Sequence, residues 1–243
     1  MALTHIQNIP VVQSPLLLKQ EWLVHGFGLK DIPIEKYVNA AGFEKSWIPK
    51  THQPHGNRVH VVQRTSDPNG AGIGHRVMEG DAFVTDQPGV VCWVRTADCL
   101  PIIIVDVEKK VVGAVHAGWR STAQKIISET LAVFKTKWNS NVADLRVALG
   151  PAIGGHCYHV GPDVAKIFTE AGLCPGPWME EMDRGHWFLD LAFANLHLLH
   201  EAGLEREQVY VSLACTACDL ERFHSFRKEG GKKGEQVSFV IVR

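Results

Sequence analysis

Three short segments of this chain, residues 53–56, 96–101 and 116–120, contain side chains that bind transition metals. They supply two imidazoles, from His55 and His116, and one thiol, from Cys99. Two imidazoles and a thiolate suit a zinc ion, and three protein ligands leave a fourth position open for water or substrate. That arrangement is typical of catalytic rather than structural zinc. We therefore predict that His55, Cys99 and His116 bind zinc and form the catalytic centre.

The residues beside these ligands also favour a functional site. Asp98 directly precedes Cys99, and His116 is followed by two small residues, an aromatic residue and the fixed cation Arg120. Small residues allow the backbone to approach a ligand closely. A thiol beside an imidazole is also the usual pair of a cysteine nucleophile and its base. A metal-free cysteine hydrolase or deamidase that uses Cys99 and His116 is therefore the alternative to a zinc enzyme.

Eight segments rich in β-branched residues predict strands. Several of them are apolar throughout, which indicates strands that are buried on both faces. The predicted strands are residues 59–63, 81–85, 90–94, 101–105, 111–115, 145–149, 209–213 and 237–242.

Three segments have the apolar spacing and end signals of helices. The first, residues 121–137, has Ile127, Leu131 and Phe134 on its apolar face, and we expect Ser121 or Thr122 to cap it. The second begins near Pro162 and ends before Gly172, and the third follows Asp190 and ends near Gly203, with Leu191, Ala194, Leu198 and Leu199 as its apolar face.

This arrangement places His116 at the end of a strand that turns into the first helix. The free backbone N–H groups of a helix start favour an anion, and the Arg120 guanidinium would add a charge-assisted hydrogen bond. We therefore expect a phosphate or a carboxylate to bind near Arg120.

The composition is that of an ordinary globular protein, with 45% apolar and 21% charged residues and a formal net charge of -1. This charge favours neither nucleic acid nor an anionic membrane as a partner. The main basic cluster, Arg227-Lys228 with Lys232-Lys233, is interpreted as a solvated loop. No apolar run approaches the roughly 18 residues of a membrane span, and residues 1–20 lack a secretory signal pattern. We expect a cytoplasmic protein with a single domain over residues 1–243.

The six cysteines do not predict a disulfide framework in a chain of this length without a secretory signal. The spacing of Cys215 and Cys218 would suit a zinc knuckle or a redox pair. A second pair at matching spacing is missing from the sequence, so free thiols are the expectation.

Taken together, these segments resemble the laccase-domain family, also called the multicopper polyphenol oxidoreductase or YfiH-like family. The resemblance covers most of the chain and follows the order of the family's motifs. The matching segments are Gln53 with His55-Gly56, residues 81–85, 96–101, 116–120 and 150–154, and Cys215-Thr216 with residues 222–227.

The resemblance implies an α+β fold in α/β/β/α layers, with mixed β-sheets inside and helices outside. It implies a zinc site on His55, Cys99 and His116, with Gln53, Asp81, Arg120 and Arg227 binding or positioning the substrate. The implied activity is a purine nucleoside phosphorylase for adenosine, inosine, guanosine and methylthioadenosine with phosphate, accompanied by adenosine deaminase activity. The family has also been interpreted as copper polyphenol oxidases. A laccase needs several coppers, and the sequence offers one cluster of nitrogen and sulfur ligands.

The chain departs from the family pattern around the predicted ligands rather than at them. His159 replaces a carboxylate, His224 replaces a phenylalanine, and Glu235 replaces an arginine. These changes leave the metal ligands intact and alter their polar surroundings. The altered carboxyl-terminal segment, which includes His224 and Glu235, is the one feature that would support a non-catalytic binding module in which the site has decayed.

Overall fold

The computed structural model describes residues 2–64, 77–174, 176–182, 185–231 and 233–243, and it shows a mixed α+β fold. Strands dominate the chain, as the β-branched segments predict. All eight predicted strands are present, and their ends differ from the prediction by at most two residues.

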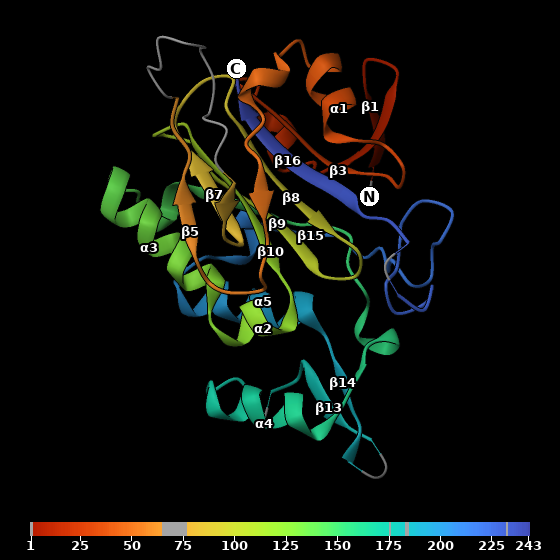
Figure 1. The fold of residues 1–243 in the computed structure, drawn as a ribbon. Helices are drawn as coiled ribbons and strands as arrows, with labels where there is room; N and C mark the ends of the chain where they lie inside the picture. Colours follow the sequence, from red (N-terminus) through yellow and green to blue (C-terminus); the bar gives the residue numbers. More distant parts are fainter. Residues whose placement is uncertain (1, 65–76, 175, 183–184, 232) are drawn as a thin grey trace.

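Two large sheets form the centre of the molecule (Figure 1). The first is antiparallel and has the order β1 (Ala2–Ile6), β2 (Ile9–Gln13), β3 (Leu23–Gly28), β16 (Gln236–Val242) and β8 (Val91–Thr96). The second is mixed and has the order β15 (Val209–Val211), β11 (Leu145–Leu149), β9 (Leu100–Asp106), β10 (Val111–Ala117), β7 (Ala82–Thr85) and β5 (Val59–Val61).

Two smaller sheets flank these layers. One joins β12 (His159–Val160), β14 (Trp187–Leu189) and β13 (Met179–Glu181), and the other pairs β4 (Thr51–His52) with β6 (Met78–Glu79). The α-helices are α1 (Ile34–Ala40), α2 (Trp119–Ala123), α3 (Ile126–Trp138), α4 (Pro162–Glu170) and α5 (Leu191–Glu201).

The buried side chains confirm the predicted α/β/β/α layers. One apolar cluster lies between the two large sheets and joins residues such as Phe27 and Val94 to Ile103 and Val112. A second cluster packs α1 on the outer face of the first sheet through Tyr37. A third cluster packs α3, α4 and α5 against the second sheet. Strands β9 and β10 are buried along their whole length because both of their faces are covered.

The first predicted helix is interrupted, which corrects the expected helix over residues 121–137. Lys125 adopts a left-handed conformation with φ of 57° and separates α2 from α3. The expected caps are also wrong, because Gly118 occupies the N-cap position of α2 and Ser121 and Thr122 are buried inside it. No glycine or proline marks this break in the sequence. The other two helices, α4 and α5, agree with the predicted helices. The Asp190 side chain caps α5 by accepting a hydrogen bond from Phe193 N.

Among the described residues, no helix combines the length and apolarity required to cross a bilayer. The longest, α3, has 13 residues.

Candidate active site

The three predicted metal ligands converge at one end of the second sheet. His116 pairs with Pro101 and Ala117 pairs with Leu100, so the register of β10 and β9 brings His116 beside the turn that carries Cys99. His55 reaches the same place from the loop after β4. The ligand atoms of His55, Cys99 and His116 lie within 4.8 Å of one another. Their arrangement is compatible with a single metal ion bound by all three side chains.

Asp81 fixes the orientation of both histidine segments. This carboxylate is fully buried, and its Oδ1 lies 2.7 Å from His116 Nδ1. It also accepts hydrogen bonds from the backbone N–H groups of His55, at 3.0 Å, and Gly56, at 2.7 Å. A metal-ligating histidine commonly binds a carboxylate through its second ring nitrogen, which leaves Nε2 of His116 for the metal. The residues present therefore fit a bound metal ion.

Two residues of the site hold an unusual backbone conformation. His55 has φ of 63° and Asp98 has φ of 86°, values that residues other than glycine seldom adopt. The Asp98 turn is held by its own side chain, which accepts hydrogen bonds from Thr216 Oγ1 at 2.6 Å and from Arg227 N at 2.7 Å. Strained backbone conformations of this kind persist only where surrounding contacts stabilise them, and they are common at functional sites. Here the Asp98 turn presents Cys99 toward the histidines.

Gly118 explains why a small residue follows His116 and Ala117. A Cβ atom at this position would lie 2.9 Å from Cys99 Sγ and 3.1 Å from His55 Cδ2. The backbone therefore packs directly against two of the three ligands. Any larger residue would displace them.

The charges within the cluster favour a thiolate. Burial raises the pKa of Cys99, but the positive charge of His116 and hydrogen bonds from His116 and His55 outweigh it and lower this pKa to about 6. Burial lowers the pKa of His116, and the charges and hydrogen bonds of Cys99 and Asp81 reverse this effect and raise it to about 9. Cys99 is thus a thiolate at neutral pH, which is the form that binds metals and acts as a nucleophile.

The cluster opens into a pocket of about 540 Å³. Its lining includes six of the predicted site residues, namely Gln53, His55, Cys99, His116, Arg120 and Arg227. The seventh, Asp81, is not among the lining residues and contacts the His116 ring and the backbone of the His55 loop. Gln53 anchors the His55 loop, because its side-chain amide exchanges two hydrogen bonds of 2.9 Å with the backbone of Arg95. A pocket of this volume accommodates a small organic ligand.

Several lining residues were not among the site residues predicted from the sequence. The aromatic side chains are Trp119, Tyr158 and Phe226, and the additional charged ones are Arg95 and Glu235. Burial raises the pKa of Tyr158, and so do the Cys99 and Asp98 charges, whereas Arg227 and Arg120 act in the opposite direction. Tyr158 therefore keeps its proton at neutral pH. The residue lies far along the chain from the ligands, and its type alone gave no signal.

The two predicted anion-binding arginines both stack on aromatic rings. The Arg120 guanidinium lies 4.1 Å from the centre of the Trp119 ring, and that of Arg227 lies 5.0 Å from the centre of the Tyr158 ring. Arg227 also donates a hydrogen bond of 2.7 Å to the backbone carbonyl of His159. The basic segment that starts at Arg227 is thus partly built into the pocket rather than being only a solvated loop. Lys232 lies outside the described residues.

The three residues that depart from the family pattern differ in how deeply they are buried and in whether they line the pocket. Glu235 lines the pocket, and its carboxylate is 4.0 Å from Arg95 Nε. His224 is buried, with Nε2 3.1 Å from Asp31 Oδ1 and Nδ1 3.4 Å from Glu229 Oε2. His159 is exposed and contacts Phe188 edge-on. Of the three, Glu235 is the one that faces the predicted substrate.

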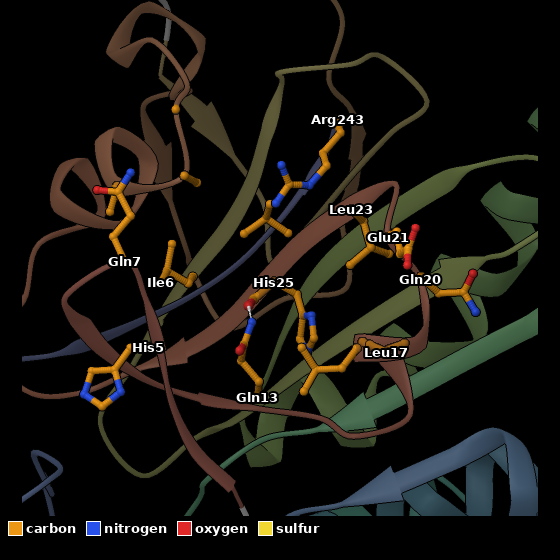
Figure 2. A pocket seen from close by; sticks show the side chains of 15 residues that line it. His5, Ile6, Gln7, Gln13, Leu17, Gln20, Glu21, Leu23, His25 and Arg243 are labelled. Carbon is orange, nitrogen blue, oxygen red and sulfur yellow. Dashed lines mark hydrogen bonds between the residues drawn. The ribbon is translucent and has the colours of Figure 1, made fainter.

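A second cavity, of about 570 Å³, lies at the N-terminal strands (Figure 2). Its lining includes His5, Gln13, His25 and Arg243, and Gln13 donates a hydrogen bond to the His25 carbonyl. Burial lowers the pKa of His25 to about 4, so this histidine is neutral at physiological pH. None of the grouped metal-ligating side chains found in the described residues lines this cavity. The chemistry therefore favours the smaller pocket at Cys99.

The structure also brings together a second group of metal-ligating side chains. His156, Cys157, Cys215 and Cys218 have their ligand atoms within 4.8 Å of one another. The spacing of Cys215 and Cys218 suggested half of such a site, and the sequence contains no second CxxC pair. The missing partners are an adjacent histidine and cysteine about 60 residues earlier in the chain.

Comparison with known proteins finds similar sequences over most of the chain. Residues 34–243 match the family model described as multi-copper polyphenol oxidoreductase laccase. The chain is 36% identical over 191 residues to the purine nucleoside phosphorylase YlmD of Geobacillus stearothermophilus, covering 77% of this chain and 69% of that one. It is 37% identical over 202 residues to a purine nucleoside phosphorylase of Deinococcus radiodurans, covering 83% and 72%.

The fold is also similar to that of a solved structure. The crystal structure of YlmD from Geobacillus stearothermophilus superposes with a TM-score of 0.84 at 27% identity, over 97% of this chain and 96% of that one. The family model covers most of the sequence, including all three ligand segments. From its sequence and its fold together, this chain belongs to the multi-copper polyphenol oxidoreductase laccase family.

Proposed function

We propose that the chain is a zinc-dependent purine nucleoside phosphorylase. Its proposed substrates are adenosine, inosine, guanosine and methylthioadenosine with phosphate, and adenosine deamination is a second proposed activity. The observation that carries the proposal is the cluster of His55, Cys99 and His116 beside a pocket that also contains arginines and aromatic rings. The relatives named purine nucleoside phosphorylase support the same reaction.

In this proposal, His55, Cys99 and His116 hold the zinc ion, and Asp81 keeps His116 in the correct tautomer. A zinc ion held by three protein ligands supplies a Lewis acid and lowers the pKa of a bound water to about 7. Copper is the alternative metal for the same donors, because imidazole and thiolate bind both. Gly118 and the Asp98 turn keep the ligands in place, since they define the space and the direction of Cys99.

The pocket offers separate groups for phosphate and for the nucleoside. Arg120 and Arg227 line it, and guanidinium groups bind phosphate through paired, charge-assisted hydrogen bonds. Stacking on Trp119 and Tyr158 restrains both arginines. The exposed Phe226 ring and the Tyr158 ring provide apolar surface for a purine. In phosphorolysis, a phosphate oxygen bonds to the ribose C1′ while the bond from C1′ to the purine nitrogen breaks, and the base leaves with a proton.

The proposal is tested by chromatography of adenosine incubated with purified protein, with and without phosphate. Adenine together with ribose 1-phosphate, formed only when phosphate is present, would support phosphorolysis. Inosine formed without phosphate would support deamination. If no free base and no inosine form under either condition, the proposal is wrong.

The lowered pKa of Cys99 also favours a second candidate, a metal-free cysteine hydrolase. Iodoacetamide alkylation separates the two. In chelator-treated protein the alkylation rate at Cys99 should rise with pH and reach half of its maximum near pH 6, whereas urea-unfolded protein should show the ordinary thiol value of about 8.5. Zinc should protect Cys99 if it is a ligand. Alkylation of the protein as purified that is unaffected by chelators would favour the hydrolase.

A further inference from the structure

The second cluster of metal-ligating side chains lies outside the pocket at Cys99 and plays no part in the proposed reaction. It combines His156 and Cys157, in a short 3-10 turn (Gly155–Cys157), with Cys215 and Cys218, in the turn that follows β15. We propose that these four side chains bind a second metal ion, a structural zinc.

The backbone holds the two segments side by side. Ala152 and Cys215 form a parallel β-bridge, and Thr216 N donates to the Ala152 carbonyl at 3.0 Å. Each turn is closed by its own hydrogen bond, from Cys157 N to Gly154 O at 2.8 Å and from Cys218 N to Cys215 O at 3.2 Å. The cluster is therefore preorganised by main-chain contacts that do not depend on the side chains.

Two of the distances between ligand atoms are close to those of a tetrahedral zinc site, and all four ligand atoms lie within 4.8 Å of one another. His156 Nε2 lies 3.3 Å from Cys218 Sγ, and Cys157 Sγ lies 3.5 Å from Cys218 Sγ. Zinc–sulfur bonds of about 2.3 Å at tetrahedral angles place two sulfur atoms about 3.8 Å apart, and a zinc–nitrogen bond shortens that spacing slightly. The observed separations need only small adjustments to reach these values. All six cysteines are free, and 3.5 Å is far longer than the roughly 2.05 Å of a disulfide bond.

The donor set identifies the metal and its role. Three cysteines and one histidine are a common ligand set of structural zinc, and four protein ligands leave no position for substrate. Cys215 is buried and its Sγ accepts a hydrogen bond of 3.1 Å from Gly154 N, which stabilises a ligating sulfur. His156 and Cys218 are exposed, so an ion can enter from solvent.

The position of the cluster gives the second ion a structural consequence. Tyr158, which lines the pocket at Cys99, directly follows Cys157. Thr216, which lies between Cys215 and Cys218, donates its hydroxyl to Asp98 beside Cys99. A zinc ion here would thus link the segment that carries Tyr158 to the segment that carries Thr216, and both segments contribute to the candidate active site. This inference does not depend on the proposed reaction.

The test is metal binding in a Cys99→Ala background, in which the first cluster has lost its thiolate. Zinc is measured by elemental analysis, and added Co²⁺ is followed by its thiolate charge-transfer and tetrahedral d–d absorption. We expect Cys99→Ala protein to hold one equivalent with a tetrahedral cobalt spectrum. Adding Cys218→Ser should weaken binding by more than about 100-fold, because even the loss of a residue that only supports a ligand costs about 10–100-fold.

Cys174→Ser in the same background is the matched control, because this half-buried cysteine lies outside the cluster and should leave binding unchanged. Should Cys218→Ser fail to fold, replacing the exposed His156 with Ala tests the same ligand set through the cobalt spectrum. Cys99→Ala protein that binds no Co²⁺, while the unaltered protein binds a single equivalent, would overturn the second site and leave the first intact. A Cys157–Cys218 disulfide in protein prepared under reducing conditions would also overturn it.

Discussion

Asp81 shows how one buried residue organises the candidate centre. Its carboxylate contacts the His116 ring and the backbone of His55 and Gly56, so two segments distant in sequence are held by one side chain. Such a partner usually increases metal affinity by fixing the ligand's orientation and tautomer. Because Asp81 is fully buried, we expect it to support the predicted ligands rather than to contact substrate.

Gly118 gives a direct test of the ligand geometry at the residue scale. In Gly118→Ala the new methyl group would meet Cys99 Sγ and His55, so the ligands must separate. We expect zinc content to fall and activity to drop by about 100-fold, the effect of misplacing a reacting group by about 1 Å. Because φ at Gly118 is -75°, the backbone can accept alanine and the fold should be retained.

Elemental analysis and far-ultraviolet circular dichroism measure the two effects separately. Gly161→Ala is the control, because its methyl group would meet only the Asp163 side chain. Full zinc and full turnover in Gly118→Ala protein would contradict the proposed arrangement of ligands.

Glu235 places a negative charge in the pocket that is proposed to bind phosphate. Its carboxylate lies near Arg95 and repels an anion that approaches the arginines. We expect Glu235→Gln to lower the KM for phosphate by about threefold, a modest change because the side chain is partly exposed to screening solvent. The measurement is the initial rate against phosphate concentration at low and moderate salt.

Glu180→Gln, at an exposed position of strand β13, is the matched control for the loss of one negative charge. It should leave this KM unchanged. An unchanged or higher KM in Glu235→Gln would show that Glu235 does not oppose phosphate binding.

At the scale of elements, the candidate site depends on where strands end. The paired ends of β9 and β10 place Cys99 and His116 together, and β7 begins directly after Asp81. Strand positions followed from β-branched segments, so this part of the site was predictable. The pairing of residues 156–157 with 215–218 was not, because it depends on an isolated bridge between loops.

The N-terminal strands contain a titratable group whose effect on stability has a definite sign. His25 in β3 is buried, its Nε2 accepts a hydrogen bond of 3.0 Å from Ser14 N, and its pKa is lowered from 6.5 to about 4. Below pH 6.5 the unfolded chain binds a proton at this histidine that the folded chain does not. Folded stability is therefore complete above pH 6.5 and declines as pH falls toward 4.

We expect this single group to remove about 2 kcal/mol of unfolding free energy between pH 7.5 and pH 5. Urea titration at the two pH values measures the loss. In the His25→Gln variant, the loss of unfolding free energy between pH 7.5 and pH 5 should be smaller by about 2 kcal/mol. The variant itself should be less stable than the unaltered protein at pH 7.5. His5→Gln, at an exposed histidine of β1, should retain the loss of the unaltered protein. Equal pH dependence in all three proteins would contradict a buried, neutral His25.

At the scale of the whole molecule, the layered fold followed from the sequence and from the family resemblance. The strands buried on both faces, such as residues 101–105 and 111–115, correctly indicated a sheet covered on each side. The break at Lys125 was missed because a lysine in a left-handed conformation has no local sequence signal. The N-terminal strands were not predicted either, and Pro10 within β2 is atypical of a strand.

The pocket likewise combines residues that could be predicted from the sequence with residues that could not. Its predicted metal ligands were recognisable because their types are chemically specific. The residues that line it come from six separate parts of the chain, around His55, Arg95, Trp119, Tyr158, Phe226 and Glu235. Only tertiary structure brings such segments together, so residue type alone could not identify Tyr158 or Arg95.

We propose that one cluster, His55, Cys99 and His116, carries metal-dependent phosphorolysis. The most direct measurement is phosphate-dependent release of adenine from adenosine by Cys99→Ala protein, beside the unaltered protein and a Cys174→Ala control. We predict that Cys99→Ala loses adenine release while it remains folded, and that Cys174→Ala keeps it. Full adenine release by folded Cys99→Ala protein would show that this cluster does not carry the reaction.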